Sequence, residues 1–364
     1  MIRFCVTLLH LLWHLEPMVQ IVGAVEMHFV QTYINQIYVV CGLVGLFLGG
    51  EGLIRGAVSI AERLNIPKLI VGLTIVGFGT SMPELLVCLQ AVNRGAPDVA
   101  LGNIIGSNTA NILLIGGVGA LIMPMSTQAK GLRRDVIVML MAGVALLWFA
   151  FKGVITQQQG LVMAGLILVY LLLVLVLERK KTIPVEMEDI GAKHLSLPWA
   201  VTFVAGGLAL LIFGADYLVK GSTAIASSMG VSEAVIGLTL VAVGTSLPEF
   251  TVSAMSAIKG QNEVSLGNII GSNIFNILAI LGITAGVYSL PVSAQFLSLD
   301  LPLMLGATLW LCVMVFAFKR IGRLSGLICL LLYAVYLTWL GLGAAGVQAL
   351  GVSVLQSLKA FAGL

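Results

Sequence analysis

Charged residues are scarce in this chain of 364 residues. Only 10% are Asp, Glu, Lys or Arg, against roughly 25% in soluble globular domains. Hydrophobic residues make up 59%, and the mean hydropathy is +1.08. This composition excludes a water-soluble fold. A transmembrane helix needs about 20 apolar residues, and stretches of that length recur from Ile37 to Gly341, which predicts a polytopic α-helical membrane protein.

The chain also lacks the motifs of the common soluble enzymes. It has no phosphate-binding Gly-Lys-Ser/Thr loop, no HExxH and no nucleophile elbow. The five cysteines form no CxxC pair and are interpreted as small hydrophobic residues. No polar connection is long enough to form a domain that binds ATP. We therefore expect neither an enzyme nor a resident cofactor, and an ion gradient as the energy source of any transport.

Apolar spans bounded by charged or turn residues fall into two groups of five. The polar segment 179–196 separates the groups and is predicted to be a cytoplasmic linker. Five-helix units are expected at 36–178 and 197–342, preceded by an N-terminal extension at 1–35, which is either a misplaced start or a signal-like segment, and followed by an interfacial tail at 343–364. The ten spans are predicted at 37–57, 69–93, 99–122, 135–151, 157–177, 198–219, 234–258, 264–288, 299–318 and 324–341.

The distribution of Lys and Arg predicts the orientation of these spans. Most of them lie in the first, third, fifth, seventh and ninth connections, and few lie in the other four. Cytoplasmic loops of membrane proteins carry an excess of positive charge, so the first set is predicted to be cytoplasmic. The expectation is a multi-pass protein of the inner (plasma) membrane with both ends of the ten-span core on the outer side. The net charge of +3 then reflects topology and does not indicate a nucleic-acid partner.

The second half of the sequence repeats the first at a fixed offset of 165 residues, so that residue 84 corresponds to residue 249. Val71–Glu84 aligns with Ile236–Glu249, and Leu101–Ile112 aligns with Leu266–Ile277, without a gap. Each half has an odd number of spans, so the second must enter the membrane upside down. The predicted fold is all-α, with ten transmembrane helices in two inverted five-helix repeats. Such repeats are typical of secondary transporters, whose site lies where the halves meet.

Glu84 and Glu249 are each the only charged residue of a long apolar span, 69–93 and 234–258 respectively. A carboxylate at the centre of a membrane helix costs roughly 2.5 to 3.5 kcal/mol even on lenient scales. The two spans contain no Lys or Arg to compensate. A bound cation is the simplest partner; the alternative is a pair of protonated glutamates bonded to their neighbours.

A proline precedes each glutamate, Pro83 in the first repeat and Pro248 in the second. A proline inside a helix removes a donor and clashes with the carbonyl four residues earlier, so we expect a broken helix. Unwound carbonyls at membrane depth are tolerated where they line a cavity. The alternative is a plain proline kink whose hydroxyls bond back to the chain. Neighbouring hydroxyl groups would add to each oxygen cluster, from Thr80 and Ser81 and from Thr245 and Ser246.

A polar stripe with a spacing of four residues follows in the third span and is repeated in the eighth. Its first members, Asn103 and Asn268, are expected mainly to join helices. The candidate ligand atoms are all oxygens, which argues against zinc, copper and iron. Hard cations such as Ca²⁺ and Na⁺ prefer oxygen ligands. Two fixed negative charges match one divalent cation, or a few Na⁺ in alternation. The better candidates for ligands in the stripe are Ser107, Asn111, Ser272 and Asn276.

The doubled Gly-Thr-Ser-x-Pro-Glu (79–84 and 244–249), each copy followed by Gly-Asn-Ile-Ile-Gly-Ser-Asn-x-x-Asn, resembles the paired α-repeats of the sodium/calcium exchanger family within the cation/Ca²⁺ antiporter superfamily. The resemblance covers 37–342. The short linker has no room for large regulatory domains, which fits a compact prokaryotic-type member. The resemblance implies ten helices in two inverted halves and a central site that Na⁺ and Ca²⁺ occupy alternately.

The resemblance also implies a role for each matching residue. Glu84 and Glu249 would be the shared carboxylate ligands. Asn276 departs from some relatives, including the potassium-dependent exchangers, which carry Asp there; potassium coupling is therefore disfavoured. Of the other implied ligands, Thr80 and Thr245 would give backbone and hydroxyl oxygens, Ser81, Ser107, Ser246 and Ser272 would complete Na⁺ positions, Asn111 and Asn276 would line the centre, and Gly77 and Ala242 would offer carbonyls.

The expected function is secondary antiport of Ca²⁺ against Na⁺ by alternating access, which would be electrogenic if more than two Na⁺ move per Ca²⁺. The expected partners are these two ions and membrane lipid, with no obligatory protein partner. A proton/Ca²⁺ antiporter of the same superfamily is the main alternative, although such proteins typically show Gly-Asn-x-x-Glu. A passive cation channel is a further alternative. A scaffold without transport would leave the two buried carboxylates unexplained.

Overall fold

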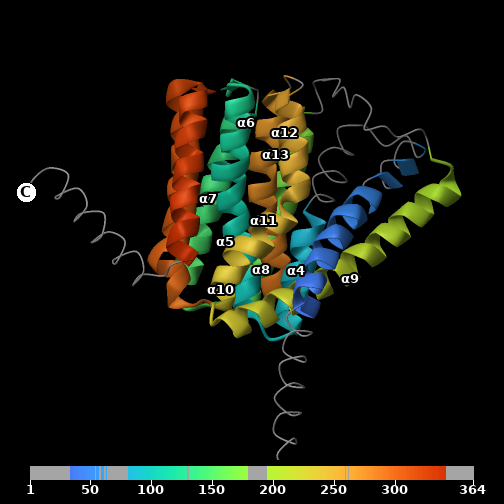
Figure 1. Cartoon of the computed structure of the whole chain (residues 1–364). Coiled ribbons are helices and arrows are strands. Elements are labelled where there is room, and N and C mark those ends of the chain that lie inside the picture. Colours follow the sequence, from blue (N-terminus) through green and yellow to red (C-terminus); the bar gives the residue numbers. More distant parts are fainter. Residues whose placement is uncertain are drawn as a thin grey trace, which may run out of the picture.

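The computed structural model describes residues 33–53, 55–56, 59–60, 63, 81–128, 131–178, 195–258, 260 and 262–341. Most helices run side by side in an upright bundle, and the helix Tyr33–Leu53 and α9 (Leu197–Met229) lean together against one side of it (Figure 1). The predicted N-terminal extension, inter-repeat linker and C-terminal tail lie almost entirely outside the described residues, so their boundaries stay predictions.

The described residues contain seven helices long and apolar enough to cross a membrane, and an eighth span if the bent pair described below is counted as one. α4 (Met82–Asn93) lies within the predicted second span, and α7 (Leu132–Ala150) begins three residues before the predicted fourth span and ends one residue before its end. Within the described residues these elements match the predicted spans to within a few residues at most ends; positions 69–80 of the second span lie outside the described residues. The seven helices are Tyr33–Leu53, Pro97–Ile122 (α5 Pro97–Ala110, η2 Asn111–Ile115, α6 Gly116–Ile122), Gln157–Leu177 in α8 (Gln157–Glu178), α9, Val264–Val287 (within α13 Asn262–Ile274, η4 Phe275–Leu281, α14 Gly282–Val287), Phe296–Phe318 (η5 Phe296–Asp300, α15 Leu301–Val313, η6 Met314–Phe318) and Arg323–Gly341.

The largest difference is at α9, which continues ten residues beyond the predicted end at residue 219. The prediction stopped at Lys220 because hydropathy falls there, but residues 220–229 contain no proline, and the helix ends only at Gly230, whose φ of +65° is the left-handed conformation that glycine adopts readily. Hydropathy locates the lipid-embedded part of a helix, whereas backbone chemistry sets where the helix ends.

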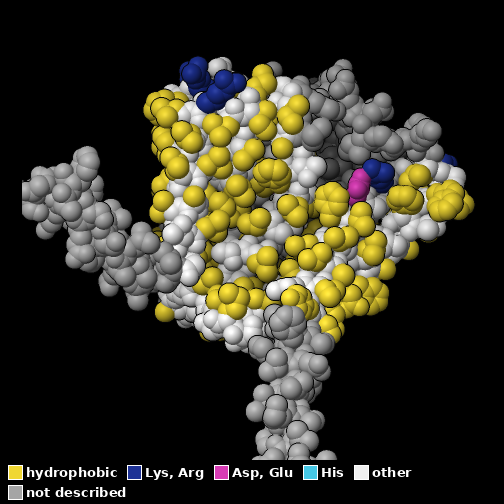
Figure 2. Space-filling view, in the orientation of Figure 1, with side chains coloured by type: hydrophobic (Ala, Val, Ile, Leu, Met, Phe, Trp, Pro, Cys, Tyr) yellow, Lys and Arg dark blue, Asp and Glu magenta, His cyan; other side chains and the backbone are white. Residues whose placement is uncertain are grey.

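Two short strand pairs join connections of the first repeat to connections of the second. β1 (Met125–Ser126) pairs with β4 (Arg320–Ile321), and β2 (Val154–Ile155) pairs with β3 (Leu290–Pro291), both antiparallel. The third and ninth connections therefore share one end of the bundle, and the fourth and eighth share the other, as inverted repeats require. Lys and Arg side chains gather at one end of the bundle (Figure 2). This arrangement agrees with the alternation of charge on which the predicted orientation rests.

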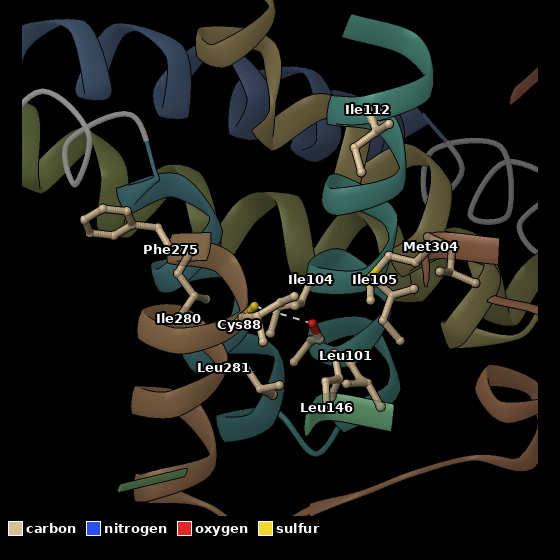
Figure 3. Close-up of a cluster of buried hydrophobic side chains, with 14 of the residues drawn as sticks. Cys88, Leu101, Ile104, Ile105, Ile112, Leu146, Phe275, Ile280, Leu281 and Met304 are labelled. Atoms are coloured by element: carbon tan, nitrogen blue, oxygen red, sulfur yellow. Dashed lines mark hydrogen bonds between the residues drawn. The ribbon is translucent and has the colours of Figure 1, made fainter. Parts of the chain in front are cut away.

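The third and eighth spans form the centre of the bundle. In each of Pro97–Ile122 and Val264–Val287, 83% of an 18-residue apolar stretch is buried inside the protein, whereas the buried share is 22% in α8 and in α9. The core packs α4, α5, α7, η4 and α15 together, and the thiol of Cys88 donates to the carbonyl of Ala100 at 3.5 Å (Figure 3). The polar stripes thus lie on the two spans most removed from lipid. Side chains drawn in this core include Cys88, Leu101, Ile104, Ile105, Leu146, Phe275, Leu281 and Met304.

Close backbone contact joins the two leaning helices. A Cβ atom on Gly49 would lie 2.8 Å from the carbonyl oxygen of Gly207, and one on Gly214 would lie 2.8 Å from the backbone nitrogen of Leu46. Only glycine permits this approach, as in other membrane helix pairs with small residues at the interface. These two helices are the first spans of the two repeats, and they therefore pack directly on each other.

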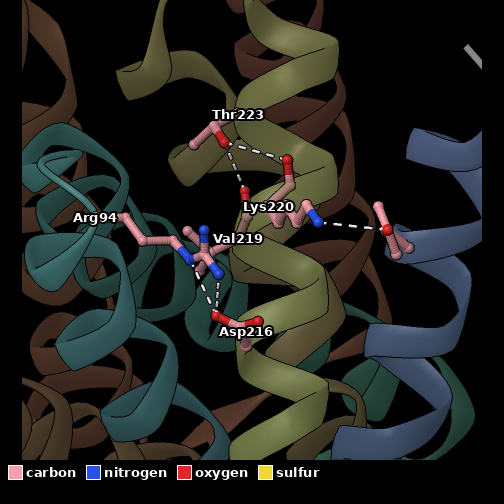
Figure 4. A network of polar contacts seen from close by, with 6 residues as sticks. Arg94, Asp216, Val219, Lys220 and Thr223 are labelled. Carbon is pink, nitrogen blue, oxygen red and sulfur yellow. Dashed lines mark hydrogen bonds and ion pairs between the residues drawn. The ribbon is translucent and has the colours of Figure 1, made fainter. Parts of the chain in front are cut away.

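Polar side chains connect α9 both to the bundle and to the helix Tyr33–Leu53 (Figure 4). Arg94, in the turn between α4 and α5, forms an ion pair with Asp216 of α9 and donates from Nε to Asp216 Oδ1 at 3.0 Å. Lys220 of α9 donates to the hydroxyl of Tyr38 at 3.3 Å, and its ammonium lies 4.5 Å from the centre of that ring. Each charge of α9 that is drawn has a partner outside α9.

A buried carboxylate on the ninth span supplies a first prediction. Asp300 is 1% exposed, and its Oδ1 accepts a hydrogen bond from Tyr336 at 2.9 Å. Replacing Tyr336 by Phe removes the donor, which should lower the free energy of unfolding by about 1–3 kcal/mol. The midpoint of thermal unfolding in detergent measures this loss. Tyr333→Phe is the matched control, because the Tyr333 hydroxyl is buried without a hydrogen-bond partner among the described residues; an equal loss in both variants would contradict the prediction.

Candidate ion-binding site

Both glutamates lie in the first turn of a helix, and in the second repeat the span breaks just before that helix. The seventh span consists of Glu233–Thr245 and α12 (Leu247–Ile258), which meet at 47° around Ser246. The break places Pro248 in the first turn of α12, where a missing N–H costs nothing. α4 likewise starts at Met82 with Pro83 next to it. The predicted break is confirmed in the second repeat; residues 64–80 of the first lie outside the described residues.

The two repeats exchange hydrogen bonds at these carboxylates. Glu84 and Glu249 are each 1% exposed. Ser246 donates to Oε1 of Glu84 at 3.2 Å, and Ser81 donates to Oε1 of Glu249 at 3.4 Å. Each glutamate therefore accepts from the serine of the opposite repeat. The reciprocal bonds place both negative charges at the interface between the repeats, with the positive ends of α4 and α12 beside them.

A second group of contacts supports the break in the seventh span. Thr245 donates to Oδ1 of Asn103 at 3.0 Å and to the carbonyl of Ala242 at 3.3 Å. Ser107 donates to the same carbonyl at 3.3 Å. Hydroxyl and carbonyl oxygens of the seventh span thus face the polar stripe of the third.

The first residues of the two stripes join helices, as expected. Asn103 donates to the backbone carbonyl of Glu84 at 3.4 Å, and Asn268 donates to that of Glu249 at 3.1 Å. α5 and α13 thereby hold α4 and α12 in place at the residue that carries the charge. The same side chains also bond Cys88 and Ser253, one turn further along α4 and α12.

Two asparagines that the sequence reasoning missed lie beside the predicted ligands. Asn111 donates from Nδ2 to Oδ1 of Asn273 at 3.1 Å, and Asn276 donates from Nδ2 to Oδ1 of Asn108 at 3.3 Å. Asn108 and Asn273 are the first asparagines of the repeated Gly-Ser-Asn-x-x-Asn, so duplication could have revealed them. A stripe with a spacing of four passed over them. The π-helical segments η2 and η4 begin at and just before the predicted ligands, and π turns often mark functional sites.

Several acceptor oxygens in this region are buried without a hydrogen-bond donor among the described residues. They include Glu84 Oε2, Asn111 Oδ1 and Asn276 Oδ1. A buried acceptor without a donor costs free energy, and a hard cation is the partner that oxygen ligands of this kind take. In the described part of the chain, no group of three or more His, Cys, Asp or Glu forms a transition-metal cluster. The arrangement suits cations that carry about two positive charges in total.

The structure brings most of the predicted ligands together. Glu84, Glu249, Ser81 and Ser246 meet directly, and Thr245, Ser107 and Ala242 form the neighbouring group. Ser272 is buried on α13 with Asn276 in the same stripe. Gly77 and Thr80 lie outside the described residues, so their roles stay predictions. The ligand set as a whole also stays a prediction, because these contacts show proximity and not ion binding.

Inverted helical repeats with two carboxylates at their interface define a secondary cation transporter as the class of this protein. Comparison with known proteins gives the family. The model of the family described as "Sodium/calcium exchanger protein" matches residues 35–176 and 199–342. The chain belongs to this family, and it is a multi-pass membrane protein.

Individual relatives match over most of their length. The chain is 37% identical to the putative antiporter CaxA of Alkalimonas amylolytica over 82% of this chain and 96% of that protein. It is 32% identical to the sodium/calcium exchanger MaX1 of Methanosarcina acetivorans, over 84% and 97% respectively. A solved structure of the sodium-calcium exchanger NCX_Mj, soaked with 10 mM Na⁺ and 10 mM Sr²⁺, is similar with a TM-score of 0.60 and 29% identity, over 84% of this chain and 98% of that chain.

Proposed function

We propose that this protein is a secondary active antiporter that exchanges Ca²⁺ for Na⁺ by alternating access. The reciprocal Ser–Glu hydrogen bonds carry the proposal, because they hold two carboxylates at the interface of the repeats. A change in the relative position of the two repeats would alter access to both carboxylates. The names of MaX1 and NCX_Mj support the same pair of ions. Both ions are substrates, and the mechanism requires no resident cofactor.

The proposed location is the inner or plasma membrane, with both ends of the ten-helix core on the outer side. Two observations support it: basic side chains gather at one end of the bundle, and the strand pairs bring the third and ninth connections to a common end. The inner membrane protein YrbG of Escherichia coli, 34% identical over 68% of this chain and 78% of its own length, agrees with such a location.

The decisive experiment measures ⁴⁵Ca²⁺ uptake by proteoliposomes that contain the purified protein. Vesicles loaded with Na⁺ are compared with vesicles loaded with K⁺ or choline, and with vesicles that carry a proton gradient. Uptake that requires internal Na⁺ is the expected result. Uptake driven by protons alone would indicate a proton/Ca²⁺ antiporter, and uptake that is indifferent to every counter-ion would indicate a channel.

Membrane potential supplies a second prediction. Two carboxylates balance one Ca²⁺, whereas more than two Na⁺ leave net positive charge, so Ca²⁺ entry should move positive charge outward. Inside-positive potential is then expected to increase Ca²⁺ accumulation. Moving one charge through 100 mV is worth about 2.3 kcal/mol, which corresponds to about a fiftyfold change in the final gradient. Vesicles clamped with K⁺ and valinomycin measure it, and equal accumulation at opposite potentials would instead mean electroneutral exchange.

A further inference from the structure

Four buried asparagines form two hydrogen-bonded pairs between the repeats, and only one member of each pair is a predicted ion ligand. Asn276 donates to Asn108 of α5, and Asn111 donates to Asn273 of α13. All four side chains are at most 1% exposed. The pairs correspond to each other under the repeat, because residue 108 matches 273 and residue 111 matches 276. Each predicted ligand is thus held by the opposite half of the protein.

The chemistry of a primary amide makes the direction of these bonds important. One end of the side chain is an oxygen that can bind a cation, and the other is an NH₂ group that only donates and carries partial positive charge. In both pairs the NH₂ group is used by the neighbouring asparagine. The oxygens of Asn111 and Asn276 remain buried without a donor among the described residues. The bonds therefore fix which end of each amide is available to an ion.

The segments that carry these amides pack against the helices that carry the carboxylates. The segment η4, which contains Asn276, packs against α4, which carries Glu84, and the segment η2, which starts at Asn111, packs against α12, which carries Glu249. A flipped amide would direct partial positive charge toward a site that has to hold cations. Keeping the oxygens in place is thus a requirement of the site and not only of the fold.

We propose that Asn108 and Asn273 are positioning residues: they hold the amides of Asn276 and Asn111 so that both carbonyl oxygens face the transported cations. The inference rests on the proposed function, since it assigns a role within the same site. Neither residue needs to touch an ion. Their removal weakens ion binding because the amides are free to rotate, while the glutamates and the alternating-access step are retained.

The hydrogen bonds of Asn108 suggest variants that separate a positioning role of this side chain from a role in packing. Its Oδ1 accepts from Asn276, whereas its Nδ2 is buried without a partner among the described residues. Asn108→Asp keeps the acceptor at nearly the same volume and replaces the unpartnered NH₂ group by a second oxygen, so the new side chain is a carboxyl group that can add negative charge. Asn108→Ala removes the acceptor. Thr109→Val is a matched control on the next residue of α5, because the Thr109 hydroxyl only bonds back to the carbonyl of Ile105 at 2.9 Å.

The test is the Ca²⁺ dependence of Na⁺-driven ⁴⁵Ca²⁺ uptake in proteoliposomes of the whole protein. Asn108→Ala is expected to raise the KM for Ca²⁺ about tenfold, equivalent to about 1.4 kcal/mol, while the maximal rate stays within about twofold. Asn108→Asp and Thr109→Val should not raise the KM more than about threefold above that of the wild type, because the acceptor is kept and an added negative charge does not weaken cation binding. An unchanged KM in Asn108→Ala, or an equal rise in Asn108→Asp, would overturn the proposal.

Asn108→Asp keeps the inference testable even if Asn108→Ala does not insert, because a tenfold rise in the KM of the Asp variant alone contradicts a role based on the acceptor. The wild type separates this inference from the proposed function. A wild type without Na⁺-driven uptake refutes the proposed function itself, whereas an active wild type with an Asn108→Ala variant of normal KM refutes only the positioning role.

Discussion

Glu84→Gln and Glu249→Gln are each expected to reduce Na⁺-driven Ca²⁺ uptake to the level of empty vesicles, while the variants still insert. Each change removes one of two negative charges at the interface of the repeats. The interaction of unit charges about 4 Å apart is worth about 4 kcal/mol at the effective dielectric of proteins, and this corresponds to roughly a thousandfold loss of affinity. Glutamine keeps the volume and the oxygen that accepts from Ser246 or Ser81, so the loss would report the charge.

Uptake normalised to the reconstituted protein measures this effect, and Glu233→Gln is the matched control. Glu233 begins α10 (Glu233–Ile236) in the same span as Glu249 but outside the hydrogen-bonded group of the site. Its variant should exchange ions at a rate within about twofold of the wild type. Near-normal exchange by either of the other two glutamine variants would remove the basis of the site, whatever the family resemblance.

The positions of the charges and of the helix break could be predicted because both depend on local chemistry. A lone carboxylate in an apolar span requires a partner wherever the helix lies, and Pro248 breaks the seventh span through the geometry of its own ring. The duplication of the motifs, with an odd number of spans in each half, then required inverted halves. The pairing of β1 with β4 and of β2 with β3 agrees with that inversion.

The hydrogen-bond partners within the site could not be predicted in the same way. The serine of each motif could have bonded back to its own helix, but Ser81 and Ser246 each bond the glutamate of the other repeat. That choice depends on how closely the two halves approach, which no single span encodes. Asn108 and Asn273 are marked by the duplicated motif, but a stripe with a spacing of four passes over them. Their partners lie across the interface, and a pattern within one helix does not show those partners.

Gly106→Val is expected to reduce exchange more than about a hundredfold, because this glycine sets the distance between the third and seventh spans. A Cβ atom on Gly106 would lie 2.6 Å from the carbonyl oxygen of Leu238 and 2.7 Å from the Cβ of Ala242. Backbone atoms at such distances cannot move aside, so valine must push α5 away from η3 (Gly237–Val241). Overpacking of this kind also costs about 1–3 kcal/mol of stability.

The functional consequence follows from the bonds that cross the same contact. Ser107 and Asn103 of α5 reach the carbonyl of Ala242 and the hydroxyl of Thr245 at 3.3 and 3.0 Å, and a shift of about 1 Å would break both. Gly165→Val on α8 is the control, since no atom lies within 4 Å of a Cβ built there. Uptake and the unfolding midpoint are measured on both variants. Normal exchange by Gly106→Val would mean that the site tolerates separation of the repeats, and the cross-repeat hydrogen bonds could then not be what holds the carboxylates in place.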